Sequence, residues 1–212
     1  MQASGLPPTP SGTPADALAV ELAVTIRHDG HGGVADDLSD PAGLTDLVRR
    51  RADAFDGVLD AARFSADEAV LGEVRELRAA VRALFARAVR PGPVSSADAD
   101  RLLPVAEAVG RLNAAAALVP TAARLEWPEG GAPVVRTETA ALAPDRDRPA
   151  AALARAAIGF LAGPDRERLR ACPAPRCVRY FVKEHPRQEW CKPSCGNRAR
   201  VARHQRRHRT AP

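Results

Sequence analysis

The most regular pattern of apolar positions along the chain lies at residues 66–90. Apolar side chains recur there at the spacing of one helix face, at Val70, Val74, Leu77, Val81, Leu84, Phe85 and Ala88. Pro91-Gly92-Pro93 would end this helix. Ser95 and Asp98 form a capping-box pattern for a next helix that stops near Pro120. The predicted inward positions of that helix are Leu102, Val105, Ala106, Val109 and Leu112.

Two further helices have clear start or stop signals. Ser39-Asp40-Pro41 places a capping residue before a proline in the first turn, which predicts a helix running to Phe55. Pro149 opens the other helix, and Gly163-Pro164 closes it. Its inward positions are Leu153, Ala157, Phe160 and Leu161.

Strand signals are fewer. Residues 18–27, rich in Leu, Val, Ile and Thr, predict a strand that leads into a Gly-rich loop at 28–33. That loop could bind a metal or phosphate, but a polar connecting loop is the favoured interpretation. Residues 124–127 and 134–139 flank a Pro-Glu-Gly-Gly turn and predict a β-hairpin. We therefore expect an α+β fold, in which a mostly helical body with a few strands spans residues 15–163.

Composition supports a protein with a core and places it away from the membrane. The hydrophobic content is 45%, and no apolar run approaches the ~20 residues that span a bilayer. Residues 1–14 are rich in Pro, Ser, Thr and Gly and predict a disordered leader without the features of a signal peptide. We expect a cytoplasmic protein. The sequence contains no credible nucleophile–base set, Walker loop or Rossmann fingerprint, so we do not expect an enzyme.

Charge is distributed unevenly between the two ends of the chain. Residues 170–212 contain 12 Lys and Arg against 2 Asp and Glu, whereas the rest contains 19 basic and 24 acidic residues. The abundance of Arg itself is explained by a GC-rich coding sequence, but codon bias would not segregate charge. An acidic body joined to a basic end favours a polyanionic partner for that end.

All four cysteines lie within this basic end, in the pattern Cys172-x4-Cys177-x13-Cys191-x3-Cys195. Two close pairs of soft ligands match a tetrahedral zinc site, and four thiolates leave no position for a catalytic water. A turn at 173–176, a strand at 178–183 and a helix from Pro193 that holds Cys195 in its first turn give a treble-clef-like plan. We predict one structural Zn²⁺; a redox switch that releases zinc and disulfide bonds are the less favoured alternatives.

The residues of this region resemble the CGNR zinc-finger family over about residues 169–208. The resemblance rests on Cys195-Gly196-Asn197-Arg198 after Trp190-Cys191, with the Cys-x4-Cys pair upstream and Phe181 between. Members of the family typically have an upstream ABATE domain, an α/β module found in proteins regarded as stress-related transcription regulators. The resemblance implies such a domain at residues 15–163 and a zinc finger with a basic C-terminal helix at 164–212.

At 100° per residue, the helix from 194 to about 208 would place Arg200, Arg203 and Arg207 in one stripe, flanked by Arg206. We predict that these arginines contact nucleic acid, with double-stranded DNA as the expected form, because Arg matches phosphates and guanine edges. One finger makes few base contacts, so a specific operator would require a homodimer. One alternative is a solvated basic face. The other is a zinc-stabilised, redox-sensitive module that binds an acidic protein of the transcription machinery.

The same helical geometry assigns supporting roles around the metal. Cys195, Val201 and Ala202 would face the hairpin. Gly196 would allow close backbone approach, and Asn197 could donate to a cysteine sulfur. Arg198 would lie on the packed side and donate to hairpin carbonyls.

Overall fold

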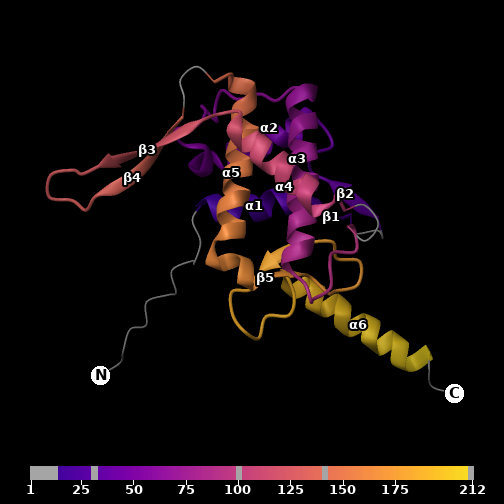
Figure 1. The fold of residues 1–212 in the computed structure, drawn as a ribbon. Helices are drawn as coiled ribbons and strands as arrows, with labels where there is room; N and C mark the ends of the chain where they lie inside the picture. Colours follow the sequence, from indigo (N-terminus) through magenta and orange to yellow (C-terminus); the bar gives the residue numbers. More distant parts are fainter. Residues whose placement is uncertain (1–13, 30–32, 99–101, 140–142, 210–212) are drawn as a thin grey trace, which may run out of the picture.

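The computed structural model describes residues 14–29, 33–98, 102–139 and 143–209. The predicted leader lies almost entirely outside the described residues, since the first helix begins at Pro14. Four helices form the centre of the body: α1 (Pro14–Val24), α3 (Glu68–Ala88), α4 (Val105–Ala117) and α5 (Arg148–Ala162). Helix α5 packs against the other three (Figure 1). Within the described residues, no helix has the length and apolar character that a membrane crossing requires.

Two of the predicted helices, α3 and α5, are confirmed together with their inward faces. Asp67 caps α3 by accepting from the Val70 N–H at 2.8 Å. The predicted stripe of α3 is buried except for Ala88, which is partly buried. The α5 stripe is buried at Leu153, Ala157 and Phe160, and Gly163 forms its C-terminal cap. These two helices supply most of the body's core because their apolar positions recur at helical spacing.

The strand predicted at 18–27 is wrong over most of its length. Leu18, Ala19, Leu22 and Ala23 are almost completely buried on one face of α1. Their i, i+1, i+4, i+5 spacing suits a helix packed against a neighbour, and this burial overrides the local β propensity. Only β1 (Ile26–His28) is a strand, and it pairs antiparallel with β2 (Val34–Asp36). Of the loop predicted at 28–33, His28 belongs to β1 and residues 30–32 lie outside the described residues.

Helix α2 (Pro41–Arg50) begins where the sequence predicts but ends earlier. The Asp40 side chain accepts from the Gly43 N–H at 2.9 Å. After α2, the short 3₁₀ helix η1 (Ala52–Phe55) turns Phe55 into the core, where it is completely buried.

The predicted cap at Ser95 and Asp98 is also wrong, because these residues form a buried turn and α4 begins only at Val105. Their side chains accept from Arg82 of α3, so they are not available to cap a helix. The inward face of α4 consists of Ala108 and Leu112. The predicted inward positions Val105, Ala106 and Val109 are exposed.

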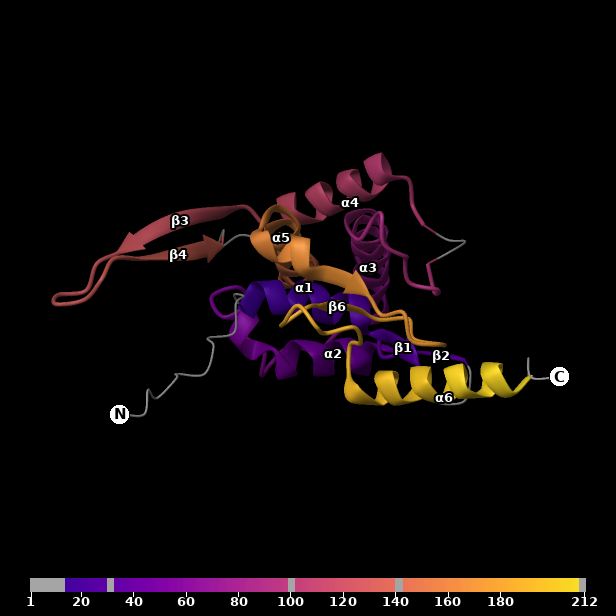
Figure 2. The same ribbon diagram turned by 90° about the horizontal axis from the view of Figure 1, so that it is seen from below.

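The predicted β-hairpin is present as β3 (Thr121–Glu126) and β4 (Val134–Thr139), paired antiparallel with Leu125 opposite Val135. It projects from the body beside α5 (Figures 1 and 2). Because it stands out from the core, nearly every one of its side chains is exposed.

The C-terminal region consists of the short 3₁₀ helix η3 (Pro164–Arg168), the antiparallel pair β5 (Leu169–Ala171) and β6 (Tyr180–Val182), and α6 (Pro193–Arg209). The β5–β6 pair belongs partly to the body, because Leu169, Ala171 and Tyr180 join its core. The Tyr180 ring meets Phe85 edge-on, with centroids 5.6 Å apart. Helix α6 lies outside this core and extends away from it (Figure 2).

Candidate zinc centre and nucleic-acid interface

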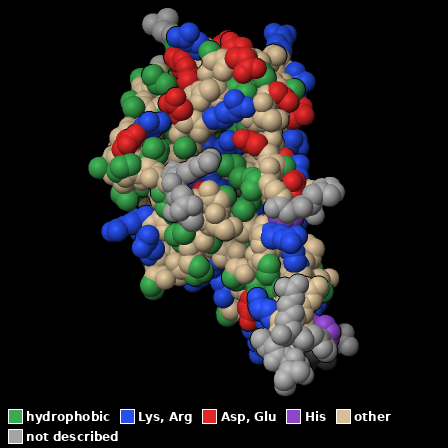
Figure 3. All heavy atoms as spheres, turned by 90° about the vertical axis from the view of Figure 1, so that its right-hand side faces the viewer, with side chains coloured by type: hydrophobic (Ala, Val, Ile, Leu, Met, Phe, Trp, Pro, Cys, Tyr) green, Lys and Arg blue, Asp and Glu red, His purple; other side chains and the backbone are tan. Residues whose placement is uncertain are grey.

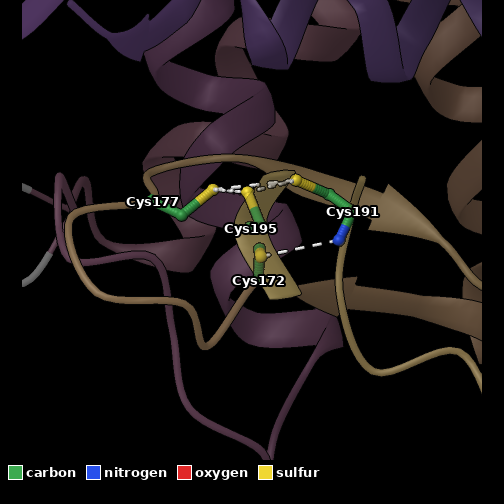
Figure 4. A group of neighbouring side chains, drawn as sticks. All are labelled: Cys172, Cys177, Cys191 and Cys195. Atoms are coloured by element: carbon green, nitrogen blue, oxygen red, sulfur yellow. Dashed lines mark hydrogen bonds between the residues drawn. The ribbon is translucent and has the colours of Figure 1, made fainter. Parts of the chain in front are cut away.

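Four elements bring the cysteines together. Cys172 follows β5, Cys177 ends the next turn, Cys191 precedes α6, and Cys195 lies in the first turn of α6. All four Sγ atoms lie within 4.8 Å of one another (Figure 4). The Sγ of Cys191 is 3.7 Å from that of Cys177 and 3.5 Å from that of Cys195, and the Cys177–Cys195 separation is 3.8 Å.

These separations fit a zinc ion. A tetrahedron with Zn–S distances of ~2.3 Å has S···S edges of about 3.8 Å. A disulfide would need sulfurs about 2.05 Å apart, so the arrangement is not that of bonded pairs. Cys172, Cys177 and Cys195 are buried and Cys191 is partly buried, which leaves a closed site of four thiolates. The chemistry that zinc would supply here is structural: it joins four separate segments.

Backbone geometry prepares the first pair of ligands. The Cys172 N–H donates to the Arg179 carbonyl at 2.9 Å, and the Cys177 N–H donates to the Ala174 carbonyl at 3.0 Å. Arg176 adopts a left-handed conformation with φ of 62°, which turns the chain so that Cys177 can face Cys172. The Cys191 N–H donates to the Cys172 Sγ at 3.5 Å and ties the two halves of the site together.

The thiols of the metal-free cluster compete for protons. Hydrogen bonds from Cys177 and Cys191 lower the pKa of the Cys172 thiol to about 2. The hydrogen bond to Cys172 raises the pKa of Cys177 to about 11. Hydrogen bonds to Cys172 and Cys177 raise the pKa of Cys191. One thiolate is therefore stabilised while nearby thiols keep their protons, because several negative sulfurs at this distance require a cation.

A small apolar group surrounds the cysteines. Ala174 and Phe181 are buried in it, and Trp190 packs against it. The Trp190 ring comes so close to Gly196 that a Cβ there would meet its Cδ1 at 3.0 Å. Gly196 is therefore placed where the backbone of α6 and an aromatic ring approach closely.

The two other residues of the CGNR tetrapeptide have roles that differ from those predicted. Arg198 lies on the packed side of α6, but its Nη2 donates to the Cys195 Sγ at 3.2 Å and not to hairpin carbonyls. Asn197 was expected to donate to a sulfur, whereas it is exposed and accepts from Arg200. Asn197 lies about 200° around the helix from Cys195, so it points away from the cluster, while Arg198 lies on the same side as Cys195.

The arginines predicted to contact nucleic acid are all exposed on α6: Arg200, Arg203, Arg206 and Arg207. In the face drawn in Figure 3, acidic side chains gather over the upper part of the molecule, away from α6 at the lower end. Val201, expected to pack on the hairpin, is 56% exposed. The buried position is Ala199 instead, in the second turn of α6.

Two family models match successive parts of the chain. The ABATE model, described as "Putative stress-induced transcription regulator", matches residues 16–164. This chain belongs to the ABATE family. The CGNR zinc-finger model matches residues 168–208, directly after it. No curated protein matches the sequence.

A buried polar cluster joins the ABATE domain to the CGNR finger, and sequence reasoning missed it. It consists of Arg82, Ser95, Asp98 and Tyr180, which we call the Arg82 latch. The Arg82 guanidinium donates to both Asp98 carboxylate oxygens, at 2.8 and 3.0 Å, and to the Val178 carbonyl at 3.2 Å.

The finger contributes its own contacts to the Arg82 latch. The Tyr180 hydroxyl donates to Asp98 at 2.6 Å, and the Arg82 guanidinium lies 5.2 Å from the centroid of the Tyr180 ring. The Ser95 hydroxyl donates to the Val178 carbonyl at 2.9 Å. The available sequence signal was an arginine next to the inward positions Val81 and Phe85 of α3. Ser95 and Asp98 lie 13 and 16 residues from Arg82 along the chain, and Val178 lies 96 residues away. The sequence alone does not identify partners at such separations.

Proposed function

We propose that this ABATE protein is a transcription regulator that binds nucleic acid through α6 of its CGNR finger, with double-stranded DNA as the ligand. The observation that carries the proposal is the exposure of Arg200, Arg203, Arg206 and Arg207 on a helix that extends away from the core. The two family matches, to a transcription-regulator family and to a zinc finger, support it.

The physical basis is electrostatic. An α-helix fits the major groove, and guanidinium groups make charge-assisted hydrogen bonds to phosphates and guanine edges. Zinc holds the start of α6 through Cys195, and the Arg82 latch fixes the finger on the ABATE domain. The helix is thus presented from a rigid base. A homodimer would place two such helices on successive half-sites and supply the contacts that one finger lacks.

The rest of the proposal follows from this role. The protein binds and does not catalyse, and it acts in the cytoplasm, where it meets nucleic acid. The ABATE domain positions the finger and supplies the part of the molecule on which a stress signal acts.

A charge-neutralisation experiment with a matched control tests the proposal. The first variant changes Arg200, Arg203 and Arg207 to Gln. The control changes three exposed body arginines, Arg63, Arg87 and Arg146, so that both variants lose the same charge. Gel-shift titration with an arbitrary duplex at low salt should show a loss of several kcal/mol for the α6 variant, at about 1–3 kcal/mol per charged contact.

The control variant should bind DNA nearly as well as the unmodified protein, and both variants should keep their zinc. Equal weakening in the two variants would mean that only total charge matters. Unchanged binding in the α6 variant would oppose the proposal and favour an acidic protein of the transcription machinery as the partner.

A further inference from the structure

A small cavity lies where the ABATE domain meets the CGNR finger. Its volume is about 230 Å³. Strand β1 of the body, the turn before β6 and the start of α6 all contribute to its wall. The lining includes Arg27, His28, Arg179, Lys192, Ser194 and Arg198. Four of these residues, Arg27, Arg179, Lys192 and Arg198, carry a permanent positive charge.

Several of these cations have hydrogen-bond donors without an acceptor. Among the described residues, no hydrogen-bond or ion-pair partner is found for Arg179, which is partly buried, or for Lys192, which is exposed. The Nε of Arg198 is buried and also lacks one. Buried donors are normally paired with protein, water or an ion. The buried Nε of Arg198 therefore lacks the acceptor that such a donor normally has, and the uncommitted charges of Arg179 and Lys192 beside it favour a ligand rich in acceptors.

Nearby anions already have partners of their own. The Asp37 carboxylate accepts from the Nε of Arg27 at 2.6 Å, and that of Asp29 accepts from the Gly33 N–H at 3.0 Å. Cys177 also forms part of the wall, and a zinc tetrathiolate carries two negative charges. Arg198 meets this negative charge directly, through Cys195. The charges of Arg179 and Lys192 remain for another anion.

We propose that this cavity binds a small oxyanion, specifically a phosphate group. Guanidinium and ammonium groups line the cavity from three elements of the fold and suit the oxygens of a phosphate. The Ser194 hydroxyl and the nearby N-terminus of α6 add donors and a favourable dipole. The cavity is smaller than typical pockets for drug-sized ligands, which begin at about 300 Å³. It therefore accommodates a free phosphate or the phosphate end of a larger molecule.

The cavity and the arginine stripe lie on opposite sides of α6. At 100° per residue, Ser194 and Arg198 are on one side, whereas Arg200, Arg203 and Arg207 are on the other. A duplex bound along the stripe would not fill the cavity. The oxyanion site is thus separate from the proposed DNA contact, and it stands even if α6 does not bind DNA. Because its wall comes from both modules, a bound phosphate would hold the finger against the ABATE domain.

Calorimetric titration of the zinc-loaded full chain with inorganic phosphate tests the site. The ionic strength is kept constant with sodium chloride, so that non-specific screening does not change. The unmodified protein should bind phosphate saturably. The double variant Arg179→Gln/Lys192→Gln should bind at least about tenfold more weakly, since it loses two charged donors. Lys192→Arg should retain binding, because it keeps the charge and the donors.

The matched control is Arg203→Gln/Arg207→Gln, which removes the same charge from the other side of α6. It should bind phosphate like the unmodified protein, and zinc content should be equal in all variants. Absence of saturable binding to the unmodified protein would overturn the proposal. Equal weakening in both double variants would also overturn it, because the effect would then follow total charge.

A second titration distinguishes the two sources of a phosphate group. If the ligand is a free phosphate or phosphorylated small molecule, phosphate at constant ionic strength should leave duplex DNA binding unchanged, and so should the Arg179→Gln/Lys192→Gln change. If the group belongs to a nucleic-acid backbone, phosphate should compete with DNA and the same variant should weaken DNA binding. Either result supports the site and assigns its occupant.

Discussion

The ABATE domain and the CGNR finger are stabilised in different ways. In the ABATE domain, α1, α3, α4 and α5 bury a contiguous set of Leu, Val, Ala and Phe side chains. In the finger, the independent buried cluster is limited to Cys172, Ala174, Cys177, Phe181 and Cys195. A segment of about 40 residues cannot bury enough apolar area to fold alone. The finger instead depends on zinc at one end and on the ABATE core, through Tyr180, at the other.

This difference explains the character of α6. A helix in a body with a large core must give one face to that core, as α3 and α5 do. Helix α6 is held at its first turns by Cys195 and Ala199, so the remaining turns are free to be polar and basic. Metal binding therefore replaces hydrophobic burial and leaves a basic helix surface exposed.

Removal of one ligand should have the largest effect. Cys191→Ser should abolish zinc binding and unfold the finger beyond β6, because structural zinc contributes about 10–16 kcal/mol in isolated fingers. The helices of the ABATE domain should persist. Metal analysis and hydrogen exchange measure the two results, with Ser194→Ala as the neighbouring control. Retained zinc, or a body that unfolds completely, would contradict this division.

Breaking the Arg82 latch should affect both regions at once. Arg82→Ala leaves the buried Asp98 carboxylate without its cation, which costs about 3–5 kcal/mol. Thermal unfolding of the zinc-loaded protein should shift as one transition, because the latch joins α3 to the finger. Arg87→Ala, an exposed change on the same helix, should stay within about 0.5 kcal/mol. Two separate transitions, of which only one moves, would show that the modules are independent.

Zinc affinity should fall as the pH falls. The pKa of Cys177 is raised to about 11 by its hydrogen bond to Cys172, and that of Cys191 is raised by the same neighbour. Both thiols hold protons at neutral pH in the metal-free protein, and zinc must displace them. Each displaced proton weakens binding up to about tenfold per pH unit of acidification. Calorimetry in buffers of different ionisation enthalpy should therefore detect proton release; its absence would contradict the pKa pattern.

The smallest effect is expected at Arg198. Its donation to the Cys195 Sγ stabilises a thiolate, and loss of such a supporting contact typically lowers metal affinity about 10–100-fold. Arg198→Met keeps much of the side-chain volume, so competition with a zinc chelator reports the lost contact. Arg203→Met on the opposite side of α6 serves as the control. Equal zinc affinity in both variants would limit Arg198 to packing.

The sequence predicted the parts of the molecule that depend on local patterns. The apolar stripes of α3 and α5 recur at helical spacing. The two cysteine pairs lie within one short segment and predict a zinc site without any information from the rest of the chain. Even so, it misassigned α1, because Leu18, Ala19, Leu22 and Ala23 suit a buried helix as well as a strand. The deciding factor was packing against α5, which local pattern does not contain.

Polar residues were harder to assign than apolar ones. Ser95 and Asp98 have the spacing of a helix cap, yet the distant Arg82 and Tyr180 recruit them into the core. The contact to a cysteine sulfur is made by Arg198 and not by Asn197, because one residue along α6 is a rotation of about 100°. In each case the chemistry was recognisable, but the partner was set by the three-dimensional fold.

The most direct test of the proposed role of α6 is the salt dependence of DNA binding. The logarithm of the dissociation constant is measured against the logarithm of salt concentration for the unmodified protein and for the Arg200, Arg203 and Arg207 to Gln variant. Each phosphate contact contributes about one unit of slope. We predict a slope smaller by about three units in the variant, with zinc content unchanged. An identical slope and affinity would contradict the assignment of α6 as the DNA-binding surface.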